Sequence, residues 1–473
     1  MTSQKIPLKF QNEHRLDFSQ GNVLHKRSQS GGISAIRFFL DAREILTPFR
    51  ESLNPLQADL LDIALACYVA DRLTLRHNKK ESSSFQWNRI FRLKMAVRVP
   101  EVWSSSGVKG DLLGLLQFLT DDNWNFEFSA FEKPELPNRI QISLFPPPQL
   151  PAKVALYSGG LDSFAGAVQE VSNFQDHSFV LVSGSTNQRQ RASQKKQVRA
   201  IRKLSPSEIH HIVVPFGIMW DKERALKEES SQRTRGFLFL ILGVIMALKA
   251  GLNRLHLYEN GIGAINLPYN ASQNGAMNSR ATNPLFLLRV ESLLYRITEK
   301  PFQIMNPFLF QTKGEMCKHQ AVHSLANLLP LTFSCDGFPV RTAGKPQCGW
   351  CTSCLLRRLS LEVGGHSELD DGDMYIVDLL SVDSKVSDRQ LRNLKAMEWQ
   401  YQKLSRRLAG IDKWRNLAIE FPMLERLVAE LSLYKESHVE ELRKSILQLY
   451  EEYVSEWRNF SARCRLNLNA KAA

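Results

Sequence analysis

The spacing of apolar and polar positions divides the chain into predicted strands and helices. Residues 91–99 alternate strictly between apolar and basic or small side chains, which is typical of a strand with one buried face. The continuous apolar run at 154–157 predicts a strand buried on both faces, as in a parallel sheet. Residues 163–171, 56–76 and 237–250 are predicted helices, the last of them largely buried.

The order of these segments predicts three domains. Residues 1–148 combine a helix with several strand candidates and are expected to form an N-terminal α+β domain, ended by proline-rich residues 145–148. Residues 149–365 contain a buried parallel strand followed by a helix and are expected to form a doubly wound parallel α/β sheet. Residues 366–473 are expected to form a helical tail for packing or assembly. Further strands are expected at 32–40, 124–131 and 139–145, and tail helices at 391–408, 411–433 and 438–460.

The clearest candidate chemistry lies between the strand at 154–157 and the helix at 163–171. Two glycines there allow the backbone to approach an anion, and the hydroxyls of Ser158 and Ser163 add donors. The helix that follows points its first N–H groups and its positive dipole end at the same place. A Walker-type loop is excluded because its Gly-Lys-Ser/Thr ending is absent. We expect phosphate to bind at this turn, formed by Leu156, Tyr157, Ser158, Gly159, Gly160, Leu161, Asp162 and Ser163.

Four of the seven cysteines form the second signal. Cys348, Cys351 and Cys354 are spaced two residues apart around a glycine, and Cys335 precedes them. This spacing is typical of a tetrahedral metal site, and structural Zn²⁺ fits best. Disulfides are disfavoured in a cytoplasmic chain, and an iron–sulfur cluster or reactive, unligated thiols are the remaining alternatives. Since four cysteines leave no open coordination position, we expect the metal to stabilise the fold.

Together, the two motifs resemble a known family. The stretch Ser158–Ser163 resembles the PP-loop of the ATP pyrophosphatases, Ser-Gly-Gly-x-Asp-Ser, and the later cysteine motif resembles that of QueC, the 7-cyano-7-deazaguanine synthases. The resemblance covers about residues 153–361, and the long flanks are more similar to the QueC-like proteins of anti-phage defence, such as QatC of the Qat systems. It implies an adenine nucleotide α-hydrolase-like fold that uses ATP, Mg²⁺ and Zn²⁺.

The resemblance also implies roles for single residues. Arg235 and Lys313 are expected to neutralise charge on the phosphates, beside Ser158, Asp162 and Ser163 as the other catalytic residues. Asp162 would orient the loop or assist Mg²⁺.

Two further stretches bear on the substrates. Gln188 matches a nucleotide-binding position of the family, whereas Gln190 and Ser193 replace its histidine and glutamate. Glu259 and Asn260 are the expected deazapurine contacts, with an ordinary polar loop as the alternative.

The activity implied is ATP-dependent adenylation of 7-carboxy-7-deazaguanine with release of pyrophosphate. Amide formation on an amine follows, and the expected amine is the N-terminus of a partner protein in anti-phage defence. Three alternatives stay open at this point. They are a 7-cyano-7-deazaguanine synthase that uses ammonia, a tRNA-modifying PP-loop enzyme, and a non-catalytic scaffold that binds nucleotide.

Charge and hydropathy limit the partners and the location. The formal net charge of +13 suits polyanionic ligands, but basic and acidic residues mostly alternate, so a nucleic-acid partner is not favoured. The longest apolar run, 237–248, is too short to span a bilayer, and the first residues lack the apolar core of a secretion signal. We expect a cytoplasmic protein without membrane contact.

Overall fold

The computed structural model describes residues 12–17, 23–27, 33–41, 43–46, 53–76, 88–131, 153–219, 228–269, 279–337, 344–381 and 386–472. The strand expected at 139–145 and the proline-rich stretch at 145–148 lie outside these residues. None of the helices in the described ranges combines the length and apolarity that crossing a membrane requires.

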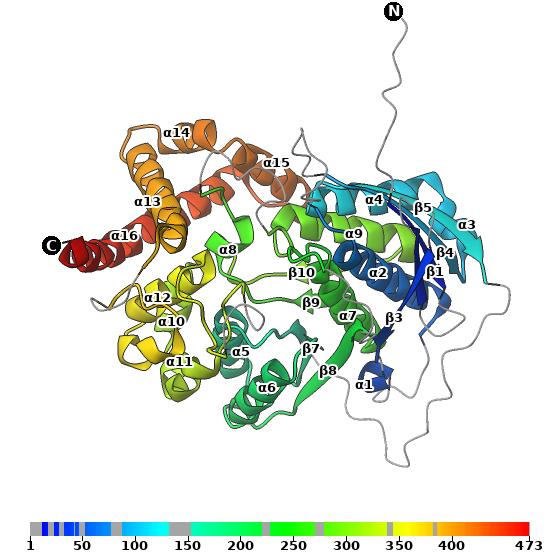
Figure 1. The fold of residues 1–473 in the computed structure, drawn as a ribbon, viewed down its shortest axis with the longest axis horizontal. Helices are drawn as coiled ribbons and strands as arrows, with labels where there is room; N and C mark the ends of the chain where they lie inside the picture. The colour runs from blue at the N-terminus through cyan, green and yellow to red at the C-terminus, as the bar shows by residue number, and fades with distance from the viewer. Residues whose placement is uncertain are drawn as a thin grey trace, which may run out of the picture.

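Ten strands of the described residues form one mixed, mostly parallel sheet in the order β10-β9-β6-β7-β8-β3-β2-β1-β4-β5 (Figure 1). The fold class is therefore α/β, as expected. The strands are β1 (Asn12–Asp17), β2 (Val23–Arg27), β3 (Ile33–Leu40), β4 (Ile90–Val97), β5 (Asn123–Ala130), β6 (Lys153–Leu156), β7 (Phe179–Ser185), β8 (Ile209–Ile218), β9 (Arg254–His256) and β10 (Gln303–Met305).

Strand β6 is the centre of the parallel half. Strands β7 and β8 follow on one side of it, β9 and β10 on the other, and all four pairings are parallel. The chain thus reverses its direction of progress across the sheet at β6. The predicted buried strand at 154–157 is confirmed, since Val154 and Ala155 are both fully buried.

Helices cover both faces of this half. Val154 packs into the apolar cluster that contains α7 (Arg235–Lys249), whereas Ala155 packs into the cluster that contains α5 (Leu161–Asn173). Because successive residues of a strand face opposite sides, α7 and α5 lie on opposite faces of the sheet. Both helices were predicted from the sequence. The others here are α6 (Gln188–Ile201), α8 (Gly261–Ile265), α9 (Pro284–Thr298), α10 (Lys313–Lys318), α11 (Gln320–Ser324) and α12 (Thr352–Val363).

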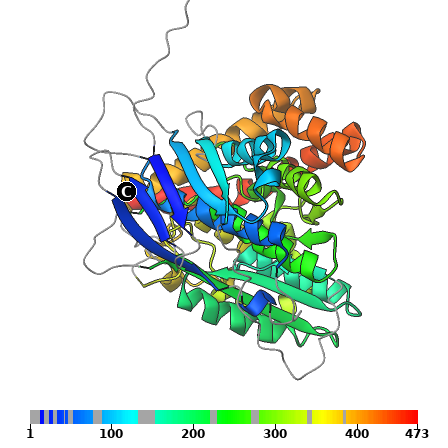
Figure 2. The same cartoon turned by 90° about the vertical axis from the view of Figure 1, so that its right-hand side faces the viewer.

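The N-terminal strands extend the same sheet. Strand β3 pairs antiparallel with β2 and, through Phe38–Leu40, antiparallel with β8. Figure 2 shows these strands, in blue and cyan, continuing the green ones. Helix α2 (Pro55–Leu73) shares one apolar cluster with α7. The predicted strands at 32–40, 91–99 and 124–131 are confirmed as β3, β4 and β5, while the boundary at 148 stays a prediction. The other helices here are α1 (Arg43–Leu46), α3 (Pro100–Ser104) and α4 (Ser106–Thr120).

The C-terminal helices begin and end at the side of the molecule away from β1, β4 and β5, and the helix at 423–435 packs against α9 nearer the middle (Figure 1). The helix expected at 411–433 is two helices, with Pro422 between them, because proline lacks the N–H that a continuous helix needs. The helices expected at 391–408 and 438–460 are confirmed. The four are α13 (Asp388–Leu408), α14 (Lys413–Glu420), α15 (Met423–Lys435) and α16 (Val439–Ala472).

Candidate functional site

The loop Ser158–Ser163 connects the end of β6 to the start of α5, as predicted. Gly159 has φ of +76°, a backbone conformation that favours glycine, and a Cβ there would meet the Gln194 Cγ atom at 2.7 Å. In open α/β sheets ligands bind at the carboxyl ends of the strands, where the strand order reverses. The loop after β6 occupies that position.

Hydroxyl and backbone groups meet inside this loop. The Ser158 and Ser163 Oγ atoms lie 3.0 Å apart, and the Gly160 N–H donates to Ser158 Oγ at 3.2 Å. Ser163 Oγ lies 3.1 Å from the Gly160 carbonyl oxygen. The first N–H groups of α5 have no acceptor inside their own helix. Hydroxyls beside such N–H groups can hold an anion such as a phosphate or pyrophosphate.

Four residues predicted to act at the site form one cluster. Lys313 Nζ lies 2.7 Å from Asp162 Oδ2, and the Asn260 amide donates to Asp162 Oδ1 at 2.9 Å. The same amide group lies 3.1 Å from Glu259 Oε1. Asp162, Lys313 and Asn260 are buried, and Glu259 is half-buried. Residues from α5, the β9–α8 turn and α10 thus meet directly behind the loop.

Burial and charge set the protonation states in this cluster. Burial alone would lower the pKa of Lys313, but the negative charge of Asp162, joined by that of Glu259 when it is ionised, outweighs burial and raises that pKa above its ordinary value. Burial, together with the negative charge of Asp162, raises the pKa of Glu259 to about 8, despite Lys313. Lys313 is therefore charged at neutral pH, and the Glu259 carboxyl is mostly protonated and able to donate a hydrogen bond.

The C-terminal helix α16 supports the cluster from behind. Thr312 caps α10 by accepting from the Glu315 N–H, and its hydroxyl donates to Glu456 Oε1 of α16 at 2.7 Å. A Cβ at Gly261, the first residue of α8, would meet Leu449 of α16 at 2.6 Å. The tail therefore contacts the two helices whose N-terminal ends carry Lys313 and Asn260.

Two other predicted site residues, Arg235 and Gln188, lie on helices that the structure places outside the Asp162 cluster. Arg235 is the first residue of α7, where it donates to Gln232 Oε1 at 3.1 Å and lies 5.8 Å from the Phe239 ring centre. Gln188 is exposed in the first turn of α6. Neither has a recorded contact with Ser158–Ser163 among the described residues, so both stay predictions.

Sequence analysis named Gln190 only as the replacement of a family histidine and missed Gln194 and Gln197, although all three side chains of α6 contact the loop. Gln190 and Gln194 donate to the Ser158 carbonyl oxygen at 3.0 and 2.8 Å, and Gln197 donates to the Gly159 carbonyl oxygen at 3.3 Å. These positions are four and three residues apart, so they share one face of the helix. Three glutamines at that spacing, after a glycine-rich turn, were the sequence signal that could have identified these contacts.

The four cysteines form the predicted cluster, which can hold a metal ion such as zinc. Their Sγ atoms all lie within 4.8 Å of one another, with Cys348–Cys354 at 3.8 Å and Cys335–Cys351 at 4.0 Å. Tetrahedral zinc with Zn–S bonds of about 2.3 Å separates its sulfurs by about 3.8 Å. A disulfide requires about 2.05 Å, so these thiols are not joined in pairs.

The local backbone fits a metal-binding turn. The Cys351 N–H donates to Cys348 Sγ at 3.3 Å, and the Gly337 N–H donates to Cys335 Sγ at 3.3 Å. Gly349 has φ of +94°, and a Cβ there would lie 1.8 Å from the Val377 carbonyl oxygen. Glycine is required at that position of the turn.

A short segment connects the cysteine cluster to the loop Ser158–Ser163. The Phe333 N–H donates to the Gly159 carbonyl oxygen at 3.3 Å, two residues before Cys335. The fully buried Arg357 of α12 donates to Thr332 Oγ1 at 2.5 Å and to the Leu329 carbonyl oxygen at 2.9 Å. Loss of the cysteine cluster would therefore disturb the hydrogen bond between Phe333 and Gly159 of the loop.

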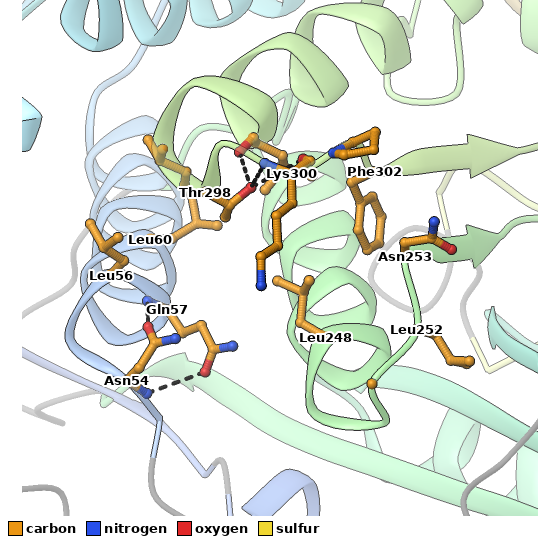
Figure 3. Close-up of a pocket in the computed structure, with 14 residues that line it drawn as sticks. Asn54, Leu56, Gln57, Leu60, Leu248, Leu252, Asn253, Thr298, Lys300 and Phe302 are labelled. Atoms are coloured by element: carbon orange, nitrogen blue, oxygen red, sulfur yellow. Dashed lines mark hydrogen bonds between the residues drawn. The ribbon is translucent and has the colours of Figure 1, made fainter.

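A separate pocket of about 440 Å³ lies away from this site (Figure 3). It is lined mainly by apolar side chains of α2, α7 and α9, and Lys300 extends into it between α2 and α7. Its residues Asn253 and Phe302 directly precede β9 and β10. The pocket therefore lies at the edge where the parallel strands begin, opposite the loop that follows β6.

A comparison of the chain with protein-family models and with curated proteins finds no match.

Proposed function

We propose that this chain is an ATP-dependent adenylating enzyme with an adenine nucleotide α-hydrolase-like PP-loop fold, which activates a carboxylate and transfers it to an amine. The carboxylate is that of 7-carboxy-7-deazaguanine, and the amine is the N-terminus of a partner protein of a defence system. One observation carries the nucleotide-binding part of the proposal, whereas the substrate and the acceptor follow from the resemblance of the two sequence motifs to the QueC-like proteins. The paired hydroxyls of Ser158 and Ser163 lie 3.0 Å apart in a glycine-rich loop, at the point where the strand order reverses.

The chemistry has two steps. A carboxylate oxygen of the substrate attacks the α-phosphorus of ATP, the bond to the β,γ-phosphates breaks, and pyrophosphate leaves. The amine nitrogen then attacks the acyl carbon, AMP leaves, and the amine loses a proton. The Ser158 and Ser163 hydroxyls and the first N–H groups of α5 would hold the leaving pyrophosphate, whose negative charge they match. Mg²⁺ would accompany the nucleotide.

Charged residues behind the loop support this assignment. Lys313 and Asp162 form a buried ion pair at 2.7 Å, which leaves neither buried charge unpaired. Asp162 thereby orients α10 and the β9–α8 turn. In the proposed reaction the Lys313 ammonium group would also neutralise charge on the phosphates. Glu259, with a pKa of about 8, donates a hydrogen bond at neutral pH and suits an acceptor such as a purine-type carbonyl.

The four cysteines would hold Zn²⁺ as a structural ion, since all four positions of a tetrahedral shell are filled by protein. The replacement of the family's histidine by Gln190 supports an acceptor other than ammonia. In this structure Gln190 holds the loop by donating to the Ser158 carbonyl oxygen.

The direct test mixes purified protein with ATP, Mg²⁺ and 7-carboxy-7-deazaguanine and measures AMP and pyrophosphate. We expect both products, and intact-mass spectrometry of co-expressed neighbouring proteins should show the mass of the deazaguanine acyl group. If no AMP forms with any amine supplied, the proposed adenylation is contradicted. A nitrile product with ammonia would indicate a 7-cyano-7-deazaguanine synthase instead, and a mobility shift with tRNA would indicate a tRNA-modifying enzyme.

The chain offers a matched pair of variants. Ser163→Ala removes a hydroxyl bonded to the carbonyl three residues earlier, at 3.1 Å, and should abolish turnover with little change in stability. Ser432→Ala removes the same kind of bond, at 3.0 Å, on α15 and should leave turnover unchanged. Equal turnover in the two variants would contradict a role of Ser163 in phosphate binding.

A further inference from the structure

Three glutamine amides on α6 hold the carbonyl groups of the phosphate loop. Gln190 and Gln194 both donate to the Ser158 carbonyl oxygen, at 3.0 and 2.8 Å. Gln197 donates to the Gly159 carbonyl oxygen at 3.3 Å, and the Phe333 N–H reaches the same oxygen at 3.3 Å. Each of the two carbonyls therefore has two donors on the side of α6 and Phe333.

The amides are themselves fixed by their surroundings. Gln194 and Gln197 are fully buried. The Gln197 Oε1 atom accepts a short hydrogen bond from the Tyr157 hydroxyl, and its Nε2 lies 3.1 Å from Ser193 Oγ. The Gln194 Cγ atom lies directly against Gly159. Little conformational freedom is left for the amides to lose when a ligand binds.

A carbonyl held on one side fixes the N–H of the same peptide on the other. In a trans peptide the C=O and N–H bonds point in opposite directions. The Ser158 carbonyl shares a peptide with the Gly159 N–H, and the Gly159 carbonyl shares one with the Gly160 N–H. The Gly160 N–H indeed points to Ser158 Oγ, at 3.2 Å, and Ser163 Oγ is 3.0 Å further on. The side away from α6 thus collects N–H and hydroxyl groups.

We propose that Gln190, Gln194 and Gln197 are positioning residues that turn the N–H groups of Gly159 and Gly160 toward the polyphosphate of the nucleotide. This inference rests on the proposed function, because it assigns the anion at the loop to a nucleoside triphosphate. Preorganised N–H groups need no reorientation when the anion binds, so binding gains from their fixed direction. Gln194, which is fully buried and makes the shortest of the amide contacts with the loop, contributes most.

The test replaces Gln194 by methionine, which keeps the length of the side chain and removes the donor. A matched control is Gln400→Met, because Gln400 of α13 is also buried and donates to a backbone carbonyl, Leu267 O, at 2.9 Å. In both residues the Oε1 atom has no hydrogen-bond partner among the described residues. The two variants should therefore lose similar stability, and only one of them touches the loop.

Calorimetric titration with the non-cleavable analogue α,β-methylene-ATP and with inorganic pyrophosphate gives the readout, beside the melting temperature. Gln194→Met should weaken the binding of both ligands about tenfold, which is about 1.4 kcal/mol of binding free energy. Gln400→Met should leave both affinities unchanged. Equal affinities of wild type and Gln194→Met would overturn the positioning role, and so would equal losses in both variants. If the wild type itself binds neither ligand, the proposed function fails. Binding without any AMP formation would reject adenylation and leave the positioning role supported by its own readout.

Discussion

The ammonium group of Lys313 lies 2.7 Å from the carboxylate of Asp162, and each residue is only 9% exposed. Replacing Lys313 by methionine would leave Asp162 buried without a cationic partner among the described residues, with the side-chain amide and the backbone N–H of Asn260 as its hydrogen-bond donors. Breaking a buried ion pair in this way costs about 3–5 kcal/mol. We therefore expect Lys313→Met to lower the free energy of unfolding strongly, as measured by urea denaturation, and to abolish AMP formation.

A double variant separates stability from chemistry. Asp162→Asn with Lys313→Met removes both charges, so it should recover much of the stability while AMP formation stays absent. If the double variant is as unstable as Lys313→Met alone, the instability of the single variant has a cause other than the unpaired carboxylate.

Metal removal should destabilise the protein and also disturb the loop Ser158–Ser163. A structural zinc site is worth on the order of 10 kcal/mol or more of binding free energy. A chelator that strips the metal, or Cys351→Ser, should lower the melting temperature and weaken binding of α,β-methylene-ATP through the Phe333–Gly159 contact. Metal analysis should find one zinc per chain before treatment. An unchanged melting temperature after complete removal would contradict a structural metal.

The free energy of unfolding should decrease as pH rises because of Glu456. Burial, helped by the charge of Glu452, raises the pKa of this carboxyl to about 7. A group with a raised pKa in the folded state stabilises fully below its unfolded pKa of about 4.5, and loses that contribution as pH rises through the folded value. Glu456→Gln mimics the protonated form, so it should match the wild type at pH 4 and exceed it by up to about 3 kcal/mol at pH 8–9. Parallel stability curves for the two proteins across this range would contradict the shifted pKa.

Helix α2 should stabilise the N-terminal end of α7. The buried Asp71 of α2 accepts from the Thr234 backbone N–H at 3.0 Å and from its hydroxyl at 2.9 Å, just before Arg235. Thr234→Val removes the hydroxyl bond to a charged group, which should cost about 1.5–3 kcal/mol in the free energy of unfolding. Thr298→Val, whose hydroxyl makes a local bond within α9 at 2.7 Å, is the control and should cost less. The reverse order would show that the contact between the two halves contributes little.

What could be predicted from the sequence was local in the chain. The loop Ser158–Ser163 is a continuous motif between a strand and a helix, and three of the four cysteines lie within seven residues, so both were found without a structure. The Asp162 cluster was predicted only as separate residues. Its members come from segments far apart in the sequence, and nothing in the spacing says that Asn260 donates to Asp162 rather than to a ligand.

The rest depended on pairings that no periodicity reveals. Pro422 was a visible signal for the break between α14 and α15, which the apolar spacing concealed. The pairing of β3 with β8 had no such signal, because a strand pattern gives the buried face and not the neighbour. The assignment of residues 1–148 to a separate domain followed from the pattern alone.

The pairing of β3 with β8 has a practical consequence for anyone who trims the chain to the half that carries the loop Ser158–Ser163 and the cysteine cluster. Removing the N-terminal residues would uncover the backbone donors and acceptors of β8 along Phe216–Ile218, together with the side of α7 that α2 covers. An uncovered strand edge beside apolar surface is a template for intermolecular pairing. A shortened protein that keeps every residue of the loop and the cysteine cluster should therefore precipitate.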